Sequence, residues 1–311
     1  MSFSSKVKDE LVENTKETMA AGLEKNCCHL SLQYGLFLFC RNFSANEISI
    51  KTENKGIAEL FCDAAREITG TKPSMGKSPK GKFTVKVESE EARQVLLSEF
   101  GYSGTEISFR LNEGLVANSC CKSAMLRGAF LSCGSVTNPE KAYHVEFVMP
   151  HKALADDFIK FLESMGFSPK HVSRNGSHVV YFKDSESIED LLTTIGATDS
   201  TLDMMGTKMY KDMRNKVNRR MNFENANSSR AFDAAYKQME AIRFIESTRG
   251  LEALSSELRE IAILRINNPE FTLKELGEAL PVPISKSGVN HRLQKIMEYA
   301  DDIRLIESVK E

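Results

Sequence analysis

One sequence phrase occurs twice in this chain, and this repetition constrains the fold more than any other feature. Cys27–Cys40 reads CCHLSLQYGLFLFC and Cys120–Cys133 reads CCKSAMLRGAFLSC, with the cysteines, the Gly and the Phe-Leu pair aligned. The correspondence continues from Ile48–Thr52 to Val145–Met149, after a turn that is longer in the second copy. Such a shift in a turn costs little free energy. A chance match between two apolar helices would not continue in this way. We therefore predict a domain built from two copies of one unit.

The later elements of each copy also correspond. Helices are predicted at Asn54–Ile68 and His151–Met165, strands at Lys82–Val87 and Ser177–Asp184, and closing helices at Glu90–Phe100 and Ser187–Ile195. The unit is thus helix–strand–(strand)–helix–strand–helix, and its copies occupy about residues 1–100 and 115–200.

A glycine lies in the middle of the first helix of each copy, at Gly35 and Gly128. Glycine inside a helix costs ~1 kcal/mol relative to alanine, so a packing reason is expected. A close crossing of the two repeated helices would supply that reason. We expect these helices to pair at the centre of an α+β domain with pseudo-two-fold symmetry.

Length and composition exclude several classes of protein. The 311 residues suffice for two or three domains, and 41% hydrophobic with 27% charged residues is ordinary for a globular protein. A formal net charge of −2 neither favours nor excludes a nucleic-acid partner, because local clustering decides this. No apolar run approaches the ~18 residues of a membrane span, and the N-terminus lacks a signal-peptide core. We expect a cytoplasmic protein without membrane association.

The seven cysteines include two adjacent pairs, Cys27–Cys28 and Cys120–Cys121, and no CxxC spacing. Adjacent cysteines do not suit a disulfide framework. The favoured interpretation is small buried thiols in a reducing compartment, with a metal or redox site as the alternative. We therefore assign no metal ligands and no cofactor.

The character of the sequence changes near residue 200. Gly206–Arg220 contains a single acid, Asp212, and six basic residues: Lys208, Lys211, Arg214, Lys216, Arg219 and Arg220. Such a run is usually a solvated face, but here it precedes a candidate DNA-binding unit, where it could contact phosphates. We predict a first domain at residues 1–205, a basic linker at 206–225 and a helical domain at 226–311, opening with a capped helix.

Three further helical segments follow residue 251. The first, SSELREIAILRINN, ends before Pro269, and the second, TLKELGEAL, begins with the Thr272 and Glu275 spacing of a capping box. Prolines interrupt the chain before the third, SKSGVNHRLQKIMEYADDI. This pattern predicts a helix-turn-helix at about residues 271–304, although a protein-docking module could share it.

The third segment carries the candidate DNA contacts. Its apolar positions form one stripe, namely Val289, Leu293, Ile296, Ala300 and Ile303. Ser287, Asn290, His291 and Gln294 lie on the other side and are predicted to read base edges, as a helix in the major groove would. Lys286, Arg292 and Lys295 are predicted to contact the phosphate backbone, and Thr272 is included among the DNA-binding residues.

The sequence LRGAFLSCGSVTNPEKAYHVEF, together with NPEFTLKELGEAL and ISKSGVNHRLQKI, closely resembles the WhiA family of bacterial DNA-binding regulators. The resemblance begins at Ser2–Leu11 and runs to the last helix. It implies an N-terminal domain similar to LAGLIDADG homing endonucleases and a helix-turn-helix domain similar to sigma-factor region four. It also implies roles in transcription control, cell division, chromosome segregation or sporulation, with double-stranded DNA as the partner and the nucleoid as the location.

The resemblance raises the question of DNA cleavage. LRGAFLSCG falls on the homing-endonuclease motif so that Cys133 takes the second acidic position, and Cys40 takes it in the other copy. Mg²⁺ prefers carboxylate oxygen to a thiol, and the nearby acids Glu47 and Glu140 lie beyond the helix ends. We therefore expect no catalytic residues and no enzyme activity.

The favoured function is a sequence-specific DNA-binding transcription regulator. Two alternatives remain: a chromosome-associated protein that acts mainly through protein contacts, and a metal-dependent endonuclease. In the first domain, Thr71–Lys82 is the best candidate for a phosphate contact, and the sheet could instead bind a protein partner.

Overall fold

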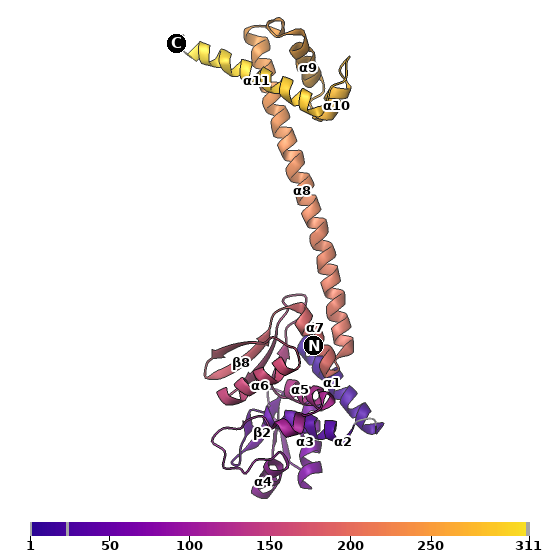
Figure 1. Ribbon diagram of the computed structural model, residues 1–311, viewed down its shortest axis with the longest axis vertical. Coiled ribbons are helices and arrows are strands. Elements are labelled where there is room, and N and C mark those ends of the chain that lie inside the picture. Colours follow the sequence, from indigo (N-terminus) through magenta and orange to yellow (C-terminus); the bar gives the residue numbers. More distant parts are fainter. Residues whose placement is uncertain (1, 23–24, 309–311) are drawn as a thin grey trace. The chain divides into compact units, whose positions relative to one another are not determined.

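The computed structural model describes residues 2–22 and 25–308. The contacts within it divide the chain after Lys211 into a first and a second domain, each described here by itself. The first contains helices and two antiparallel sheets, whereas the second is helical (Figure 1). The predicted class, an α+β domain followed by an all-α domain, is confirmed.

The first domain repeats one order of elements. Helix α1 (Phe3–Ala20) is followed by α2 (Asn26–Leu38), β1 (Asn42–Phe43), β2 (Ile48–Thr52), α3 (Lys55–Thr69), β3 (Ser74–Lys77), β4 (Phe83–Lys86) and α4 (Glu90–Glu99). After the short helix η1 (Glu113–Val116), the second copy is α5 (Ser119–Cys133), β5 (Gly134–Val136), β6 (Val145–Met149), α6 (Lys152–Ser164), β7 (Lys170–Arg174), β8 (Ser177–Phe182) and α7 (Ser185–Ile195). The sheets have matching orders, β1-β2-β4-β3 and β5-β6-β8-β7.

Two strands were not predicted from the sequence. Strand β3 pairs with β4 and strand β7 with β8, each at the edge of its sheet. Their sequences, SMGK and KHVSR, are exposed at every position, so they lack the apolar alternation that marks a strand. Thr71–Lys82 is therefore not a simple loop, because it contains β3 and a tight turn in which Ser78 N donates to Lys82 O at 2.8 Å.

Helices α2 and α5 meet at their glycines, as the repeated phrase predicts. A Cβ added to Gly35 would overlap the Met125 carbonyl oxygen and lie 3.0 Å from Ala129 N. A Cβ on Gly128 would overlap Leu32 O in the same way. The two backbones are thus close enough that only glycine fits at either position.

The core of the first domain is continuous across the two copies. Phe37 of α2 and Phe130 of α5 are both fully buried, and they belong to one cluster that includes residues from both sheets. The rings of Phe39 and Phe158, one from each copy, lie 4.8 Å apart. The copies are therefore halves of one domain.

Helix α8 (Thr198–Thr248) is a single helix of 51 residues. The predicted basic linker at 206–225 is part of it, so the expectation of a separate capped helix after the linker was wrong. The segment contains no proline and one glycine, Gly206, and nothing in it forces the helix to end. Its last part packs in the second domain with η2 (Leu251–Ala253), α9 (Ser256–Asn267), α10 (Leu273–Glu278) and α11 (Lys286–Ser308).

Within the described residues, no helix combines the length and the apolar character that crossing a membrane requires.

The glycine contact gives a first prediction. Gly35→Ala and Gly128→Ala should each lower the free energy of unfolding of the first domain by about 2–3 kcal/mol, because the added methyl group overlaps backbone atoms of the partner helix. Chemical denaturation, followed by a probe of the first domain, measures the change.

Gly206→Ala is the matched control. It lies within α8, and a Cβ there would meet no described heavy atom within 4 Å. It should leave stability unchanged or raise it by up to ~1 kcal/mol. Equal effects at Gly35 and Gly206 would contradict the close-contact assignment.

Candidate nucleic-acid interface

Helix α11 is fixed by its apolar side. Val289, Leu293, Ile296, Ala300 and Ile303, the predicted stripe, are each at most 3% exposed. They pack with Ile261 of α9, Leu276 of α10 and Ile242 of α8 in one cluster. The orientation of α11 is thereby set, and its other side is left for contacts.

The predicted contact residues on that other side are exposed. Six of them lie on the first half of α11, namely Lys286, Ser287, Asn290, His291, Gln294 and Lys295. The sequence contains no acid between Pro283 and Met297. This half of α11 therefore presents polar donors and two cations at the N-terminal, positive end of a helix.

Two of these residues share a groove with α8. Asn290 and Gln294 line a groove of ≈ 510 Å³ together with Arg230 and Lys237 of α8. The groove also contains the acids Asp233, Glu298 and Asp301. Sequence reasoning did not select Arg230 and Lys237, because they lie more than fifty residues before Asn290 in the chain.

The turn between α10 and α11 depends on a glycine. Ile284 N donates to Gly277 O at 3.1 Å, and a Cβ on Gly277 would overlap Ile284 O and lie 3.1 Å from Val289 Cγ2. The start of α11 is capped by Ser285, whose Oγ accepts from Gly288 N at 3.2 Å. These contacts hold the exposed end of α11 against α10.

Arg292 has a partner inside the protein. Its Nη2 lies 3.2 Å from the Glu257 carboxylate of α9, and its side chain is 22% exposed. The sequence predicted a phosphate contact, whereas the structure places this guanidinium in a bridge between α11 and α9.

Thr272 has a structural role at the start of α10. Its Oγ1 accepts from Glu275 N at 3.3 Å, and its backbone N donates to the Glu275 carboxylate at 2.7 Å. This is the predicted capping box, and its presence is confirmed. The hydrogen bonds from Thr272 lower the pKa of Glu275.

The basic segment of α8 divides into two groups. Lys208 Nζ lies 3.2 Å from the Glu189 carboxylate, and Lys211 Nζ donates to Pro139 O at 2.6 Å and lies 4.9 Å from the centre of the Tyr143 ring. Both lysines therefore tie α8 to the first domain. The other predicted contacts, Arg214, Lys216, Arg219 and Arg220, are exposed, and Arg220 forms an ion pair with Glu224 at 2.9 Å.

Arg265 was not selected from the sequence, yet it supports the helix-turn-helix. It is 2% exposed, and its Nη1 donates to Phe271 O at 2.7 Å, so it fixes the segment that leads into α10. Burial lowers its pKa. A charged residue one turn after Ile261, on an apolar helix face, is the signal that could have found it.

Cys40 and Cys133 align with the second acidic position of the homing-endonuclease motif. They lie at the C-terminal ends of α2 and α5. Cys40 Sγ donates to Asn42 O at 3.1 Å, and burial raises the pKa of both Cys40 and Cys133 to about 12. These groups are neutral thiols at physiological pH and do not suit Mg²⁺.

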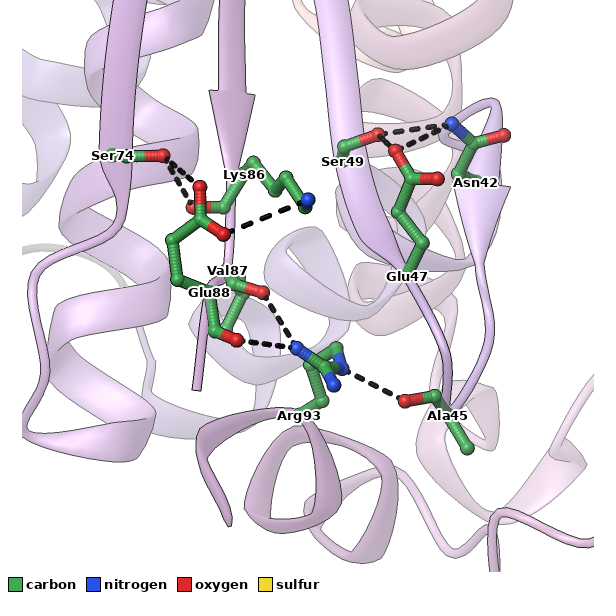
Figure 2. Close-up of polar contacts among 9 residues, drawn as sticks. All are labelled: Asn42, Ala45, Glu47, Ser49, Ser74, Lys86, Val87, Glu88 and Arg93. Atoms are coloured by element: carbon green, nitrogen blue, oxygen red, sulfur yellow. Dashed lines mark hydrogen bonds and ion pairs between the residues drawn. The ribbon is translucent and has the colours of Figure 1, made fainter. Parts of the chain in front are cut away.

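The nearby acid Glu47 is already engaged by its neighbours (Figure 2). Ser49 Oγ donates to its carboxylate at 2.7 Å and Asn42 Nδ2 at 3.1 Å, and the hydrogen bond from Ser49 is the main cause of its lowered pKa. Just after the end of β4, Glu88 accepts from Ser74 and lies 3.6 Å from Lys86 Nζ. Glu140 lies in the exposed turn after β5.

Comparisons with known proteins decide the family. Residues 122–214 match the family described as the WhiA LAGLIDADG-like domain, and residues 217–300 match the WhiA C-terminal HTH domain. A protein of Clostridium botulinum named "Probable cell division protein WhiA" is 35% identical over 98% of this chain and 99% of its own length. The chain belongs to the WhiA family.

Two further WhiA proteins are similar to the chain. One from Alkaliphilus metalliredigens is 46% identical over 63% of this chain and 62% of its own length. The crystal structure of full-length WhiA from Thermotoga maritima has a TM-score of 0.56 and 21% identity, over 97% of this chain and 99% of that chain. This second likeness shows the shared fold.

The WhiA matches relate to the candidate residues in different ways. The HTH match contains Thr272 and every candidate on α11, and it also contains Arg230 and Lys237. The LAGLIDADG-like match contains Cys133 and lies within the second copy and the start of α8. Cys40 corresponds to Cys133 through the internal repeat alone.

The capping box of this WhiA-family helix-turn-helix gives a second prediction. Thr272→Ala should lower the stability of the second domain by about 1 kcal/mol, because it removes the acceptor for Glu275 N. Thr272→Ser retains a hydroxyl acceptor and should preserve the stability. Thermal unfolding of the full chain measures both. The pKa of Glu275 is lower in the folded than in the unfolded chain. Its contribution to the free energy of unfolding is therefore present above the pKa of the unfolded state and is lost as the pH falls through the pKa of the folded state. Equal stability of the two variants would contradict the capping role.

Proposed function

We propose that this WhiA-family chain is a sequence-specific, double-stranded-DNA-binding regulator of transcription whose work is linked to cell division. The observation that carries the proposal is the exposed, acid-free first half of α11, held on a buried apolar side. The curated relatives are named as probable cell division proteins, which supports the link to division. The proposal implies a cytoplasmic protein that associates with the nucleoid.

Base reading is assigned to Ser287, Asn290, His291 and Gln294. Asn and Gln can pair with adenine through a donor and an acceptor, and Ser and His can donate to acceptors in the major groove. An α-helix fits that groove, and the N-terminal residues of a recognition helix contact the bases. Because the apolar stripe fixes the rotation of α11, these residues can approach the bases together.

Phosphate contact is assigned to Lys286 and Lys295 on α11 and to the exposed group on α8. Lys216, Arg219 and Arg220 fall within about 100° of the circumference of α8, so they can face one backbone. Arg292, Lys208 and Lys211 are bound to partners outside their own helix and are assigned to support, whereas the partner of Arg220 lies on α8 itself. Phosphate contacts supply affinity without sequence choice.

Nuclease activity is not part of the proposal. Cleavage by the homing-endonuclease route needs carboxylates that hold a hard divalent cation at the ends of the paired helices. This chain has the high-pKa thiols of Cys40 and Cys133 there, and Glu47 is bound by Ser49 and Asn42.

A role in protein contact is favoured by one surface of the first domain. Val148 of β6 and Val172 of β7 are 41% and 42% exposed, on the face of the second sheet that also carries Tyr181. The same face also carries Glu146 and Lys170, the strand partners of Tyr181, so it combines exposed valines with charged side chains. Regulation through a protein partner would add to DNA binding in this scheme.

A third prediction tests the recognition helix. The double variant Asn290→Ala, His291→Ala should lose its preference for specific sites while keeping weak, salt-sensitive binding, because it removes base contacts and leaves the cations in place. Bound sites are first mapped in cells, and binding to them and to random DNA is then compared. Unchanged footprints would contradict the assignment.

The matched control is Lys216→Ala, Arg219→Ala, Arg220→Ala on α8. It should weaken binding to all sequences alike and reduce the slope of log K against log salt by about 3, because each of the three side chains is assigned one phosphate. If this variant changed sequence preference, the division of roles between α8 and α11 would be wrong.

A fourth prediction concerns cleavage. The full chain with Mg²⁺ or Mn²⁺ should leave supercoiled plasmid intact, since no thiol with a pKa of about 12 provides a ligand for these ions. Agarose gels report nicked and linear products. Reproducible nicking that a Cys40→Ala, Cys133→Ala variant abolishes would overturn the non-enzymatic assignment.

A further inference from the structure

The N-terminal ends of α2 and α5 bring four cysteines together. These are the second and third residues of each helix, Cys27, Cys28, Cys120 and Cys121, here called the tetracysteine cluster. Their Sγ atoms all lie within 4.8 Å of one another. In residues 2–22 and 25–308 this is the one group of three or more His, Cys, Asp or Glu side chains with ligand atoms so close.

The glycine contact explains why the cluster forms. Cys28 precedes Gly35 by seven residues, and Cys121 precedes Gly128 by seven. Seven residues are almost two helical turns, so each cysteine lies on the helix face that carries the glycine. Because Gly35 and Gly128 hold the two backbones against each other, the faces with Cys28 and Cys121 also meet.

Apolar packing does not account for the four thiols. The sequence interpretation expected buried thiols, and this is wrong for Cys27 and Cys120, which are exposed. Cys121 is buried and Cys28 is half-buried. The cluster is thus open to solvent on one side, as a site that loads an ion from solution must be.

The dimensions fit one tetrahedral ion. Zn–S bonds of ~2.3 Å place the sulfurs of a tetrahedral tetrathiolate about 3.8 Å apart. Sulfurs already within 4.8 Å need only small rotations of side chains to reach that geometry. An iron–sulfur cluster would place several metal and sulfide ions among the cysteines and needs more space.

The surroundings favour a negatively charged metal–thiolate group. Two helix N-termini point at the cluster, and their positive ends stabilise thiolates. In the described part of the chain, neither helix has a side-chain cap, although Cys28 N already donates to Lys25 O at 2.9 Å. Asn118 Nδ2 lies 4.0 Å from Cys121 Sγ, and Ser31 Oγ donates to the Cys27 carbonyl at 2.7 Å.

A divalent cation among the four thiols would bind them as thiolates. Four thiolates in so small a space repel one another, and a divalent cation at their centre removes that repulsion. An ion that binds here must therefore displace protons, so its affinity should rise with pH.

We propose that the tetracysteine cluster binds a single Zn²⁺ ion that joins the two copies of the repeat at the ends of their central helices. The ion replaces four thiol protons and crosslinks segments more than ninety residues apart in the chain. Such a crosslink stabilises the paired helices without any contact to DNA. The site would not be recognised by spacing, because each helix supplies adjacent cysteines in place of a CxxC pair.

The test uses the reduced, metal-free full chain and Co²⁺ as a spectroscopic substitute for Zn²⁺. One equivalent of Co²⁺ should produce the intense visible bands of tetrahedral thiolate coordination, and one equivalent of Zn²⁺ should remove them. Saturation at one ion per chain is expected. Absence of stoichiometric binding would overturn the proposal, as would an iron–sulfur absorption spectrum from protein isolated without air.

Variants locate the ion. Cys27→Ser, Cys120→Ser changes two exposed side chains and should lower the affinity for Zn²⁺ at least 100-fold, and Zn²⁺ should then no longer raise Tm. Cys62→Ser in α3 is the matched control and should bind as the parent does, since Cys62 lies outside the cluster. Equal Zn²⁺ affinity of the cluster variant and the parent would show that the tetracysteine cluster is not the zinc site.

A measurement on the unmodified chain covers the case in which a variant does not fold. Zn²⁺ should protect Cys27 and Cys120 from a maleimide reagent, and a chelator should restore their reaction, as read by peptide mass spectrometry. If these thiols stay reactive with Zn²⁺ present, or are found joined in disulfides under reducing conditions, the site is not a zinc site.

Discussion

The backbone contact between α2 and α5 is the constraint on which the first domain depends. Gly35 and Gly128 leave no room for a Cβ, so the two helices approach as closely as helices can. This approach places Phe37 and Phe130 in one core that includes residues from both sheets. The same contact aligns the two helix ends, and both ends carry cysteines. Fold and candidate chemistry in this domain therefore share one cause.

The repeat allowed much of the first domain to be predicted, and the exceptions have physical reasons. Elements that bury an apolar face, such as α3 and β6, show apolar residues at helical or strand spacing in the sequence. Strands β3 and β7 bury no side chains and are held by backbone hydrogen bonds to their neighbours. Backbone hydrogen bonds do not impose a pattern of apolar and polar side chains, so the sequence does not reveal these strands. The sequence showed the two cysteine pairs and left a metal or redox site as the alternative, but it did not assign the tetracysteine cluster, because only the helix pairing brings its two halves together.

In the second domain the sequence predicted the buried stripe of α11 but could not assign its charges. Whether a basic side chain is free to contact DNA depends on the acidic partners that the fold places beside it. Arg292 is paired with Glu257, and in the first domain Lys208 is paired with Glu189, although no spacing rule connects these residues. Arg265 is the reverse case, a charged residue that folding buries to hold Phe271 O. Arg230 and Lys237 enter the candidate interface only because α8 continues as one helix past the predicted linker.

The two ends of the α2–α5 pair carry the same residue type in opposite electrostatic settings. At the C-terminal ends, the negative helix dipole and burial both disfavour thiolates, and the pKa values of Cys40 and Cys133 are raised to about 12. Two carboxylates there would repel each other unless a cation lay between them, so neutral thiols let the helices pair without one. At the N-terminal ends, the helix dipoles have the opposite sign, and the exposed Cys27 and Cys120 leave a path for a soft cation. The helix pair thus has thiols in place of carboxylates for hard cations at one end, and at the other end it has the four cysteines proposed to bind zinc.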